Sequence, residues 1–95
     1  MSNLYNVEFL EDSVFSPYVI DGPNIGKLRS EIETILTEEE RQGGPYDIDC
    51  LAANIFGVNE DAASGKIDQP KTDEEYIAAI VADYRANLQQ WQRLF

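Results

Sequence analysis

The chain has 95 residues, of which 43% are apolar and 26% are charged, and 18 Asp and Glu against 7 Lys and Arg give a formal net charge of −11. A chain of this size has enough apolar residues for one core, so we expect residues 1–95 to form a single compact domain. The negative charge argues against direct binding to nucleic acid or to an anionic membrane and favours a basic partner.

The residue types that are absent or rare exclude most catalytic and metal chemistry. The chain has no histidine, which removes Ser-His and Cys-His nucleophiles and most zinc and iron sites, and Cys50 stands alone. No apolar run reaches about 18 residues, and the first residues lack the order of a secretory signal. We therefore expect a cytoplasmic protein that is not an enzyme, contacts no membrane and needs no cofactor.

A β-hairpin is predicted at the N-terminus, with strands over about residues 4–10 and 14–20. Tyr5, Val7 and Phe9 alternate along the first segment, and the second segment is rich in Val, Phe, Tyr and Ile. An Asp-Gly-Pro stretch then ends the strand pattern.

Two helices are predicted next, over about residues 24–41 and 46–56. In the first, apolar residues recur at three- and four-residue spacing, and this helix should end before Gly43. These apolar residues are Ile25, Leu28, Ile32, Ile35 and Leu36. The second helix should bury one face and end at Gly57. That face consists of Ile48, Leu51, Ala52, Ile55 and Phe56.

A third helix is predicted over about residues 73–95, and Thr72 and Glu75 match a capping box at its start. Apolar residues form a continuous stripe within about 60° of Ile77. The expected fold class is therefore α+β, mostly helical, with a hairpin followed by three helices. The stripe is expected to pack on the core; an alternative is a homodimer interface formed by Tyr84, Leu88, Trp91 and Phe95.

The acidic residues are concentrated between residues 38 and 75, where eleven acids against three bases give a net charge of −8. Glu38, Glu39 and Glu40 would end the first predicted helix, where each negative charge costs about 0.3–1 kcal/mol against the helix dipole. Thr37 and Glu40 also match a capping box, which would begin a separate turn. Three interpretations follow: a solvated face, ion pairs within the chain, or a contact for a basic partner.

The leading functional hypothesis is a non-enzymatic protein-binding module that docks on a basic protein surface as an inhibitor or regulator. The predicted partner-binding residues are Glu38, Glu39, Glu40, Asp47, Asp49, Glu60 and Asp61. If the partner handles nucleic acid, these carboxylates would stand in for phosphates, as in a DNA mimic or an anti-restriction or anti-CRISPR type inhibitor. Two alternatives are an assembly protein that self-associates through its last helix, and a small enzyme that works through carboxylates.

Overall fold

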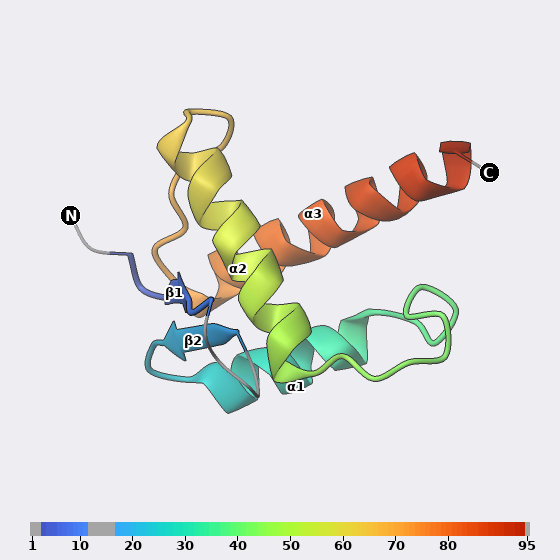
Figure 1. Ribbon diagram of the computed structural model, residues 1–95, viewed down its shortest axis with the longest axis horizontal. Coiled ribbons are helices and arrows are strands. Elements are labelled where there is room, and N and C mark those ends of the chain that lie inside the picture. The colour runs from blue at the N-terminus through green and yellow to red at the C-terminus, as the bar shows by residue number, and fades with distance from the viewer. Residues whose placement is uncertain (1–2, 12–16, 95) are drawn as a thin grey trace.

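The computed structural model describes residues 3–11 and 17–94, with side chains as far as residue 88 (Figure 1). Its elements in chain order are β1 (Asn6–Phe9), β2 (Tyr18–Asp21), α1 (Ile25–Ile35), α2 (Ile48–Ala63) and α3 (Asp73–Leu94). The predicted fold class, an α+β and mostly helical chain that begins with a hairpin, is confirmed. The part of the second predicted strand at 14–16 and the predicted helix end at Phe95 lie outside the described residues.

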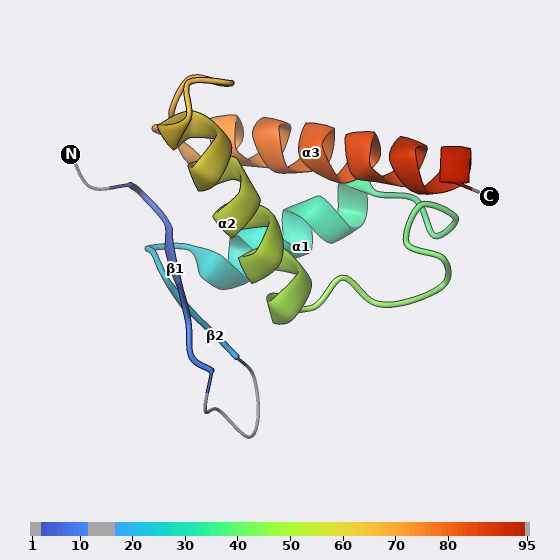
Figure 2. The ribbon, with the colours of Figure 1, turned by 45° about the horizontal axis from the view of Figure 1, so that its top comes forward.

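The two strands form an antiparallel pair in which Val7 lies opposite Ile20 and Phe9 opposite Tyr18. Val7 and Ile20 are partly buried against the core. Because every second side chain of a strand points to the same face, Phe9 and Tyr18 continue the face that packs on the helices. Figure 2 shows the hairpin at one side of the molecule, pointing away from the three helices.

The core lies between α1, α2 and α3 and is closed on one side by the residues that lead into the hairpin. Its largest fully buried side chains include three tyrosines, Tyr5, Tyr46 and Tyr76. The rings of Tyr5 and Tyr76 meet edge to face at 5.1 Å, and the Tyr5 hydroxyl donates to Asp73 Oδ1 at 2.7 Å. Burial, and next the bond to Asp73, raise the pKa of Tyr5 to about 12. The Tyr46 hydroxyl donates to Asn54 Oδ1 and the Tyr76 hydroxyl to Asn59 Oδ1, each at 2.9 Å, so all three buried hydroxyls have a polar partner, as burial requires.

The first helix ends at Ile35, six residues before its predicted end at 41. Leu36 has extended backbone, with ψ of 134°. The capping box then forms as the sequence suggested: Thr37 Oγ1 accepts from Glu40 N at 3.0 Å, and Glu40 Oε1 accepts from Thr37 N at 3.0 Å. A separate turn that satisfies its own backbone groups competes with a longer helix, so the three glutamates do not lie at the end of α1.

The prediction that Gly57 ends the second helix is wrong, because α2 continues to Ala63. A Cβ atom at Gly57 would meet Asp83 Oδ2 at 3.4 Å, so Gly57 lies inside the helix on the side that faces α3. The helix instead ends at Ala63, Gly65 lies two residues further on with φ of +84°, and Lys66 N donates to Asp61 O at 2.9 Å. This is the left-handed glycine termination that was predicted at Gly57, found about two turns later.

Two side chains predicted to be buried by the second helix lie at its surface. Ile48 is 41% exposed and Phe56 is 46% exposed. The buried stripe is formed by Leu51, Ala52, Ile55 and Val58. The helix is therefore buried along a narrower face than its apolar pattern suggested, because the hairpin covers it only in part.

The start of α3 agrees with its predicted capping signal. Thr72 Oγ1 accepts from Glu75 N at 3.2 Å, while the Glu75 carboxylate accepts from Lys71 N rather than from Thr72 N. Tyr76 and Ile80 are fully buried, so the buried face is centred slightly to one side of Ile77. No helix among residues 3–11 and 17–94 combines the length and apolar character that crossing a membrane requires.

Candidate functional site

The structure distributes the predicted partner-binding acids over the turn after α1 and the two ends of α2. Glu38, Glu39 and Glu40 lie in the turn after α1, and Asp47 and Asp49 lie at the start of α2. The other two acids, Glu60 and Asp61, lie near the far end of that helix. A helix of 16 residues is about 24 Å long, so the two ends of α2 cannot contribute to one small site.

Glu40 is committed to the chain's own structure. Its Oε2 atom accepts from Arg85 Nε at 2.7 Å, which ties the turn to α3, and its carbonyl oxygen accepts from the Tyr84 hydroxyl at 2.9 Å. The hydrogen bonds from Arg85 and from Thr37 lower the pKa of Glu40 to about 2. Of the three interpretations, an ion pair within the chain therefore holds for Glu40, whereas Glu38 and Glu39 are exposed.

Replacing Glu40 by Gln is expected to lower the thermal midpoint at pH 7. Gln can keep the capping box, so the change isolates the charge that faces Arg85. Because the folded pKa is about 2 against an ordinary 4.5, the stabilisation is present above pH 4.5 and is lost as pH falls toward 2. Thermal unfolding would be measured across this pH range for Glu40→Gln and for a Glu39→Gln control. The difference in thermal midpoint between the two variants should be largest above pH 4.5 and should disappear as the pH falls toward 2. A difference that widened in acid would contradict the assignment.

Asp47 and Asp49 also have local structural roles. The Asp47 side chain caps α2 by accepting from Cys50 N at 2.9 Å, and this bond holds the pKa of Asp47 below its usual range. Asp49 lies in the first turn, where a negative charge complements the helix dipole. These local roles explain the positions of both acids without a partner protein.

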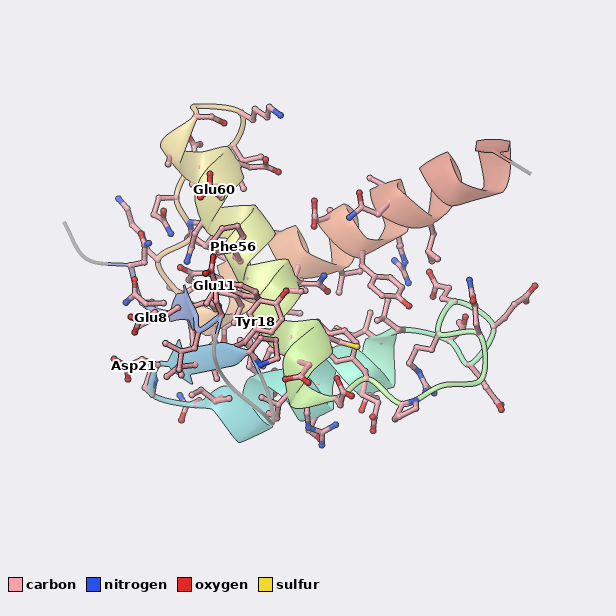
Figure 3. All side chains as sticks on the ribbon, viewed as in Figure 1. Glu8, Glu11, Tyr18, Asp21, Phe56 and Glu60 are labelled. Carbon is pink, nitrogen blue, oxygen red and sulfur yellow. The ribbon has the colours of Figure 1, made fainter. Side chains whose placement is uncertain are left out.

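A surface that the sequence did not single out lies where the hairpin meets α2. We call it the hairpin–α2 face and define it by Phe9, Glu11, Tyr18, Phe56 and Glu60. Phe9 is 53% exposed and Phe56 is 46% exposed, and the Phe9 ring meets the half-buried Tyr18 ring at 5.6 Å. In the view of Figure 3, Glu11 and Tyr18 of the hairpin are seen against the middle of α2, where Phe56 is labelled, and Glu60 lies further along that helix.

Helix geometry and one hydrogen bond place Phe56 on the side of α2 that faces the hairpin. Asn59 Nδ2 donates to the carbonyl oxygen of Tyr5 at 2.9 Å, at the start of β1. Phe56 lies about 60° from Asn59 around the helix axis, and Glu60 lies about 40° beyond Phe56. The phenyl ring and the carboxylate are therefore neighbours on the helix surface, with Phe56 on the side of the strands and Glu60 turned further toward solvent.

Both elements that form this face carry acids and no bases. The described parts of the hairpin, residues 6–11 and 17–21, contain three acids, and α2, residues 48–63, contains three, with no Lys or Arg in any of these segments. These acids are Glu8, Glu11, Asp21, Asp49, Glu60 and Asp61. Ion pairs elsewhere in the described chain join Lys27 to Glu31, Arg29 to Glu33, and Arg85 to Glu40. The local field at the hairpin–α2 face is therefore strongly negative.

A cleft of about 900 Å³ lies between α2, the 64–71 connection and α3. Asp61, Asp68, Glu75, Asp83 and Lys71 line it together with apolar residues. Burial raises the pKa of Asp83, and the nearby charge of Asp61 raises it further. The cleft thus brings carboxylates together, as the carboxylate-enzyme alternative requires, but these groups suggest no reaction in which each would have a defined role.

The alternative dimer residues are only partly described. The Tyr84 side chain is half-buried in its own chain, where its ring meets that of Tyr46 at 6.2 Å. Leu88 is also half-buried, and the side chains of Trp91 and Phe95 lie outside the described residues. In the part of the chain that the structure describes, no three Cys, Asp or Glu side chains gather in a way that could hold a metal ion.

Comparison with protein-family models, with curated proteins and with solved structures found no match. The functional interpretation therefore rests on the surfaces of this chain alone. The signal that could have found the hairpin–α2 face is the strand alternation, which placed Phe9 on the same side as Val7. What the alternation could not show is that α2 covers Val7 but leaves Phe9 exposed.

Proposed function

We propose that this protein is a non-enzymatic acidic binding module that docks on a basic surface of a partner protein and thereby inhibits or regulates it. The observation that carries the proposal is the hairpin–α2 face, where exposed aromatic side chains lie among carboxylates and the surrounding segments contain no basic residue. Exposed aromatic residues are typical of protein interfaces, and the surrounding negative charge selects a basic partner.

The net charge of −11 sets the class of partner. Nucleic acid carries the same sign of charge and would be repelled. A protein that itself binds nucleic acid carries a complementary basic surface, so a DNA mimic or an anti-restriction or anti-CRISPR type inhibitor is a specific form of this proposal. Glu38 and Glu39 remain predicted contacts, because both are exposed and adjoin a turn that is fixed by Glu40.

Self-association through α3 is a second candidate. Figure 1 shows the second half of this helix extending beyond α1 and α2 toward the C-terminus. Tyr84 already packs within its own chain, so the interface would have to use the residues that follow it. A protein that stays monomeric at high concentration in analytical ultracentrifugation would exclude this candidate.

Binding to the partner is expected to depend strongly on salt. The partner would be isolated on the immobilised protein from an extract of the source organism, purified, and titrated by calorimetry at low and at high salt. Because exposed charges are screened by salt, the dissociation constant should rise at least about tenfold between the two conditions. An affinity that is the same at both salt concentrations, or a partner with an acidic surface, would contradict the proposed function.

A further inference from the structure

We infer that the hairpin–α2 face binds a basic protein segment in which an apolar side chain lies between Arg or Lys residues. The inference rests on the proposed function and adds both the location of the docking surface and the chemistry of the segment it takes. It follows from three features of this face: the exposed rings, the sign of the charge around them, and the contrast with the acidic turn at residues 38–40.

The exposed rings provide the apolar part of the contact. A phenylalanine side chain presents roughly 200 Å², so Phe9 at 53% and Phe56 at 46% exposure each leave on the order of 100 Å² in contact with solvent. Tyr18 packs edge to face against Phe9 and holds that ring in place. Side chains that cover Phe9 and Phe56 would gain apolar contact, and Phe9 would not first have to be ordered.

The charges around the rings decide what can bind there. A second copy of this chain would bring the same acids against one another, and nucleic acid would bring phosphates, so both occupants are disfavoured by like charge. An Arg or Lys near Glu11 and Glu60 would meet an opposite charge, and a guanidinium can also stack on the faces of Phe9 and Phe56. Charge complementarity therefore commits the face to a basic protein segment.

The acidic turn at residues 38–40 lacks this combination. One of its three carboxylates is already paired with Arg85, and Arg41 directly follows the turn's glutamates. None of residues 37–45 is aromatic. The turn can contribute to the long-range attraction of a basic partner, but it offers no apolar anchor point.

A synthetic peptide with one Trp flanked on both sides by Arg is the probe for this inference. Its affinity would be measured by fluorescence anisotropy of a dye on the peptide, and its position by backbone amide shifts in NMR spectra of the full chain. Two control peptides keep the length: one replaces Trp by Ser, and the other replaces each Arg by Glu. We expect shifts that centre on Phe9 and Phe56, binding about fivefold weaker without Trp, and no binding without Arg.

Variants of the protein then separate the face from general attraction by negative charge. Glu11→Lys combined with Glu60→Lys should weaken binding of the Trp peptide at least about tenfold. Glu38→Lys combined with Glu39→Lys changes the net charge by the same amount and should cost less than about threefold. Phe56→Ala should cost about fivefold, whereas Ile35→Ala, which removes another exposed apolar side chain, should have no effect.

Several results would overturn the inference. Absence of binding by the Trp peptide, equal losses from the two charge-reversal pairs, or amide shifts centred on residues 37–45 would each do so. Circular dichroism and unfolding curves identify any variant that fails to fold. If Phe56→Ala does not fold, the variants at the exposed Glu11 and Glu60 still test the inference. The proposed function is judged separately, by the salt dependence of the natural partner, and survives if that partner binds at another surface.

Discussion

Replacing Asn59 by Ala is expected to lower the free energy of unfolding by about 1–2 kcal/mol, because two buried polar groups would each lose their shortest hydrogen bond. The Tyr5 carbonyl would keep only the 3.5 Å contact with the Tyr76 hydroxyl, and that hydroxyl would keep its bond from Gln69. Asn59 Nδ2 donates to the carbonyl oxygen of Tyr5, and Asn59 Oδ1 accepts from the Tyr76 hydroxyl at 2.9 Å. Both tyrosines are fully buried, so water cannot replace the lost bonds without opening the core. Chemical denaturation monitored by circular dichroism measures the loss.

The matched control is Asn87→Ala, on the exposed side of α3. Asn87 makes one long contact, 3.5 Å from Nδ2 to Asp83 Oδ2, so its removal should change stability by less than about 0.5 kcal/mol. If Asn59→Ala were as mild as this control, the link between α2 and the start of β1 would not be a stabilising one. Asn59→Ala should also weaken binding of the Trp peptide, because the bond from Asn59 to Tyr5 holds the hairpin against α2.

Replacing Gly22 by Ala is expected to destabilise the protein by about 2–3 kcal/mol through overpacking. A Cβ atom at this position would lie 2.6 Å from Tyr5 Cε1 and nearer still to Cδ1. Tyr5 is fully buried and its hydroxyl is bonded to Asp73, so the ring has little freedom to move aside. Thermal and denaturant unfolding would both report the loss.

Gly26→Ala provides a control with the opposite expected sign. No atom lies within 4 Å of a Cβ atom added at Gly26, which belongs to the first turn of α1. Alanine favours helix over glycine, so this change should stabilise the protein by up to about 1 kcal/mol. Equal effects from the two substitutions would show that backbone freedom, and not the contact with Tyr5, determines the outcome at Gly22.

Gly22 and Asn59 both lie where the hairpin is attached to the rest of the chain. Gly22 follows β2 and packs on Tyr5, while Asn59 ties the residue before β1 to the middle of α2. Asp73, at the start of α3, accepts from both Tyr5 and Asn24. The residues that flank the two strands are therefore fixed by α2 and α3, which favours a rigid docking surface.

Local signals in the sequence determined the order and type of the elements. Strand alternation, the spacing of apolar residues and the capping pair Thr72 and Glu75 each act within a few residues, so the hairpin and three helices could be predicted without knowing how they pack. The capping pair Thr37 and Glu40 was equally visible. Its competition with a longer first helix could not be decided, because the helix pattern and the turn signal overlap at the same residues.

Only the tertiary structure decided where α2 ends and which apolar side chains stay at the surface. Gly57 lies within a helix that continues to Ala63, on a side that faces Asp83 of α3, a residue far away in the sequence. The ion pair of Glu40 also depends on a residue far away in the sequence, because Arg85 reaches it from α3. Phe9 and Phe56 look like core residues in their own segments, and they form a surface because a two-stranded hairpin covers only part of one helix face.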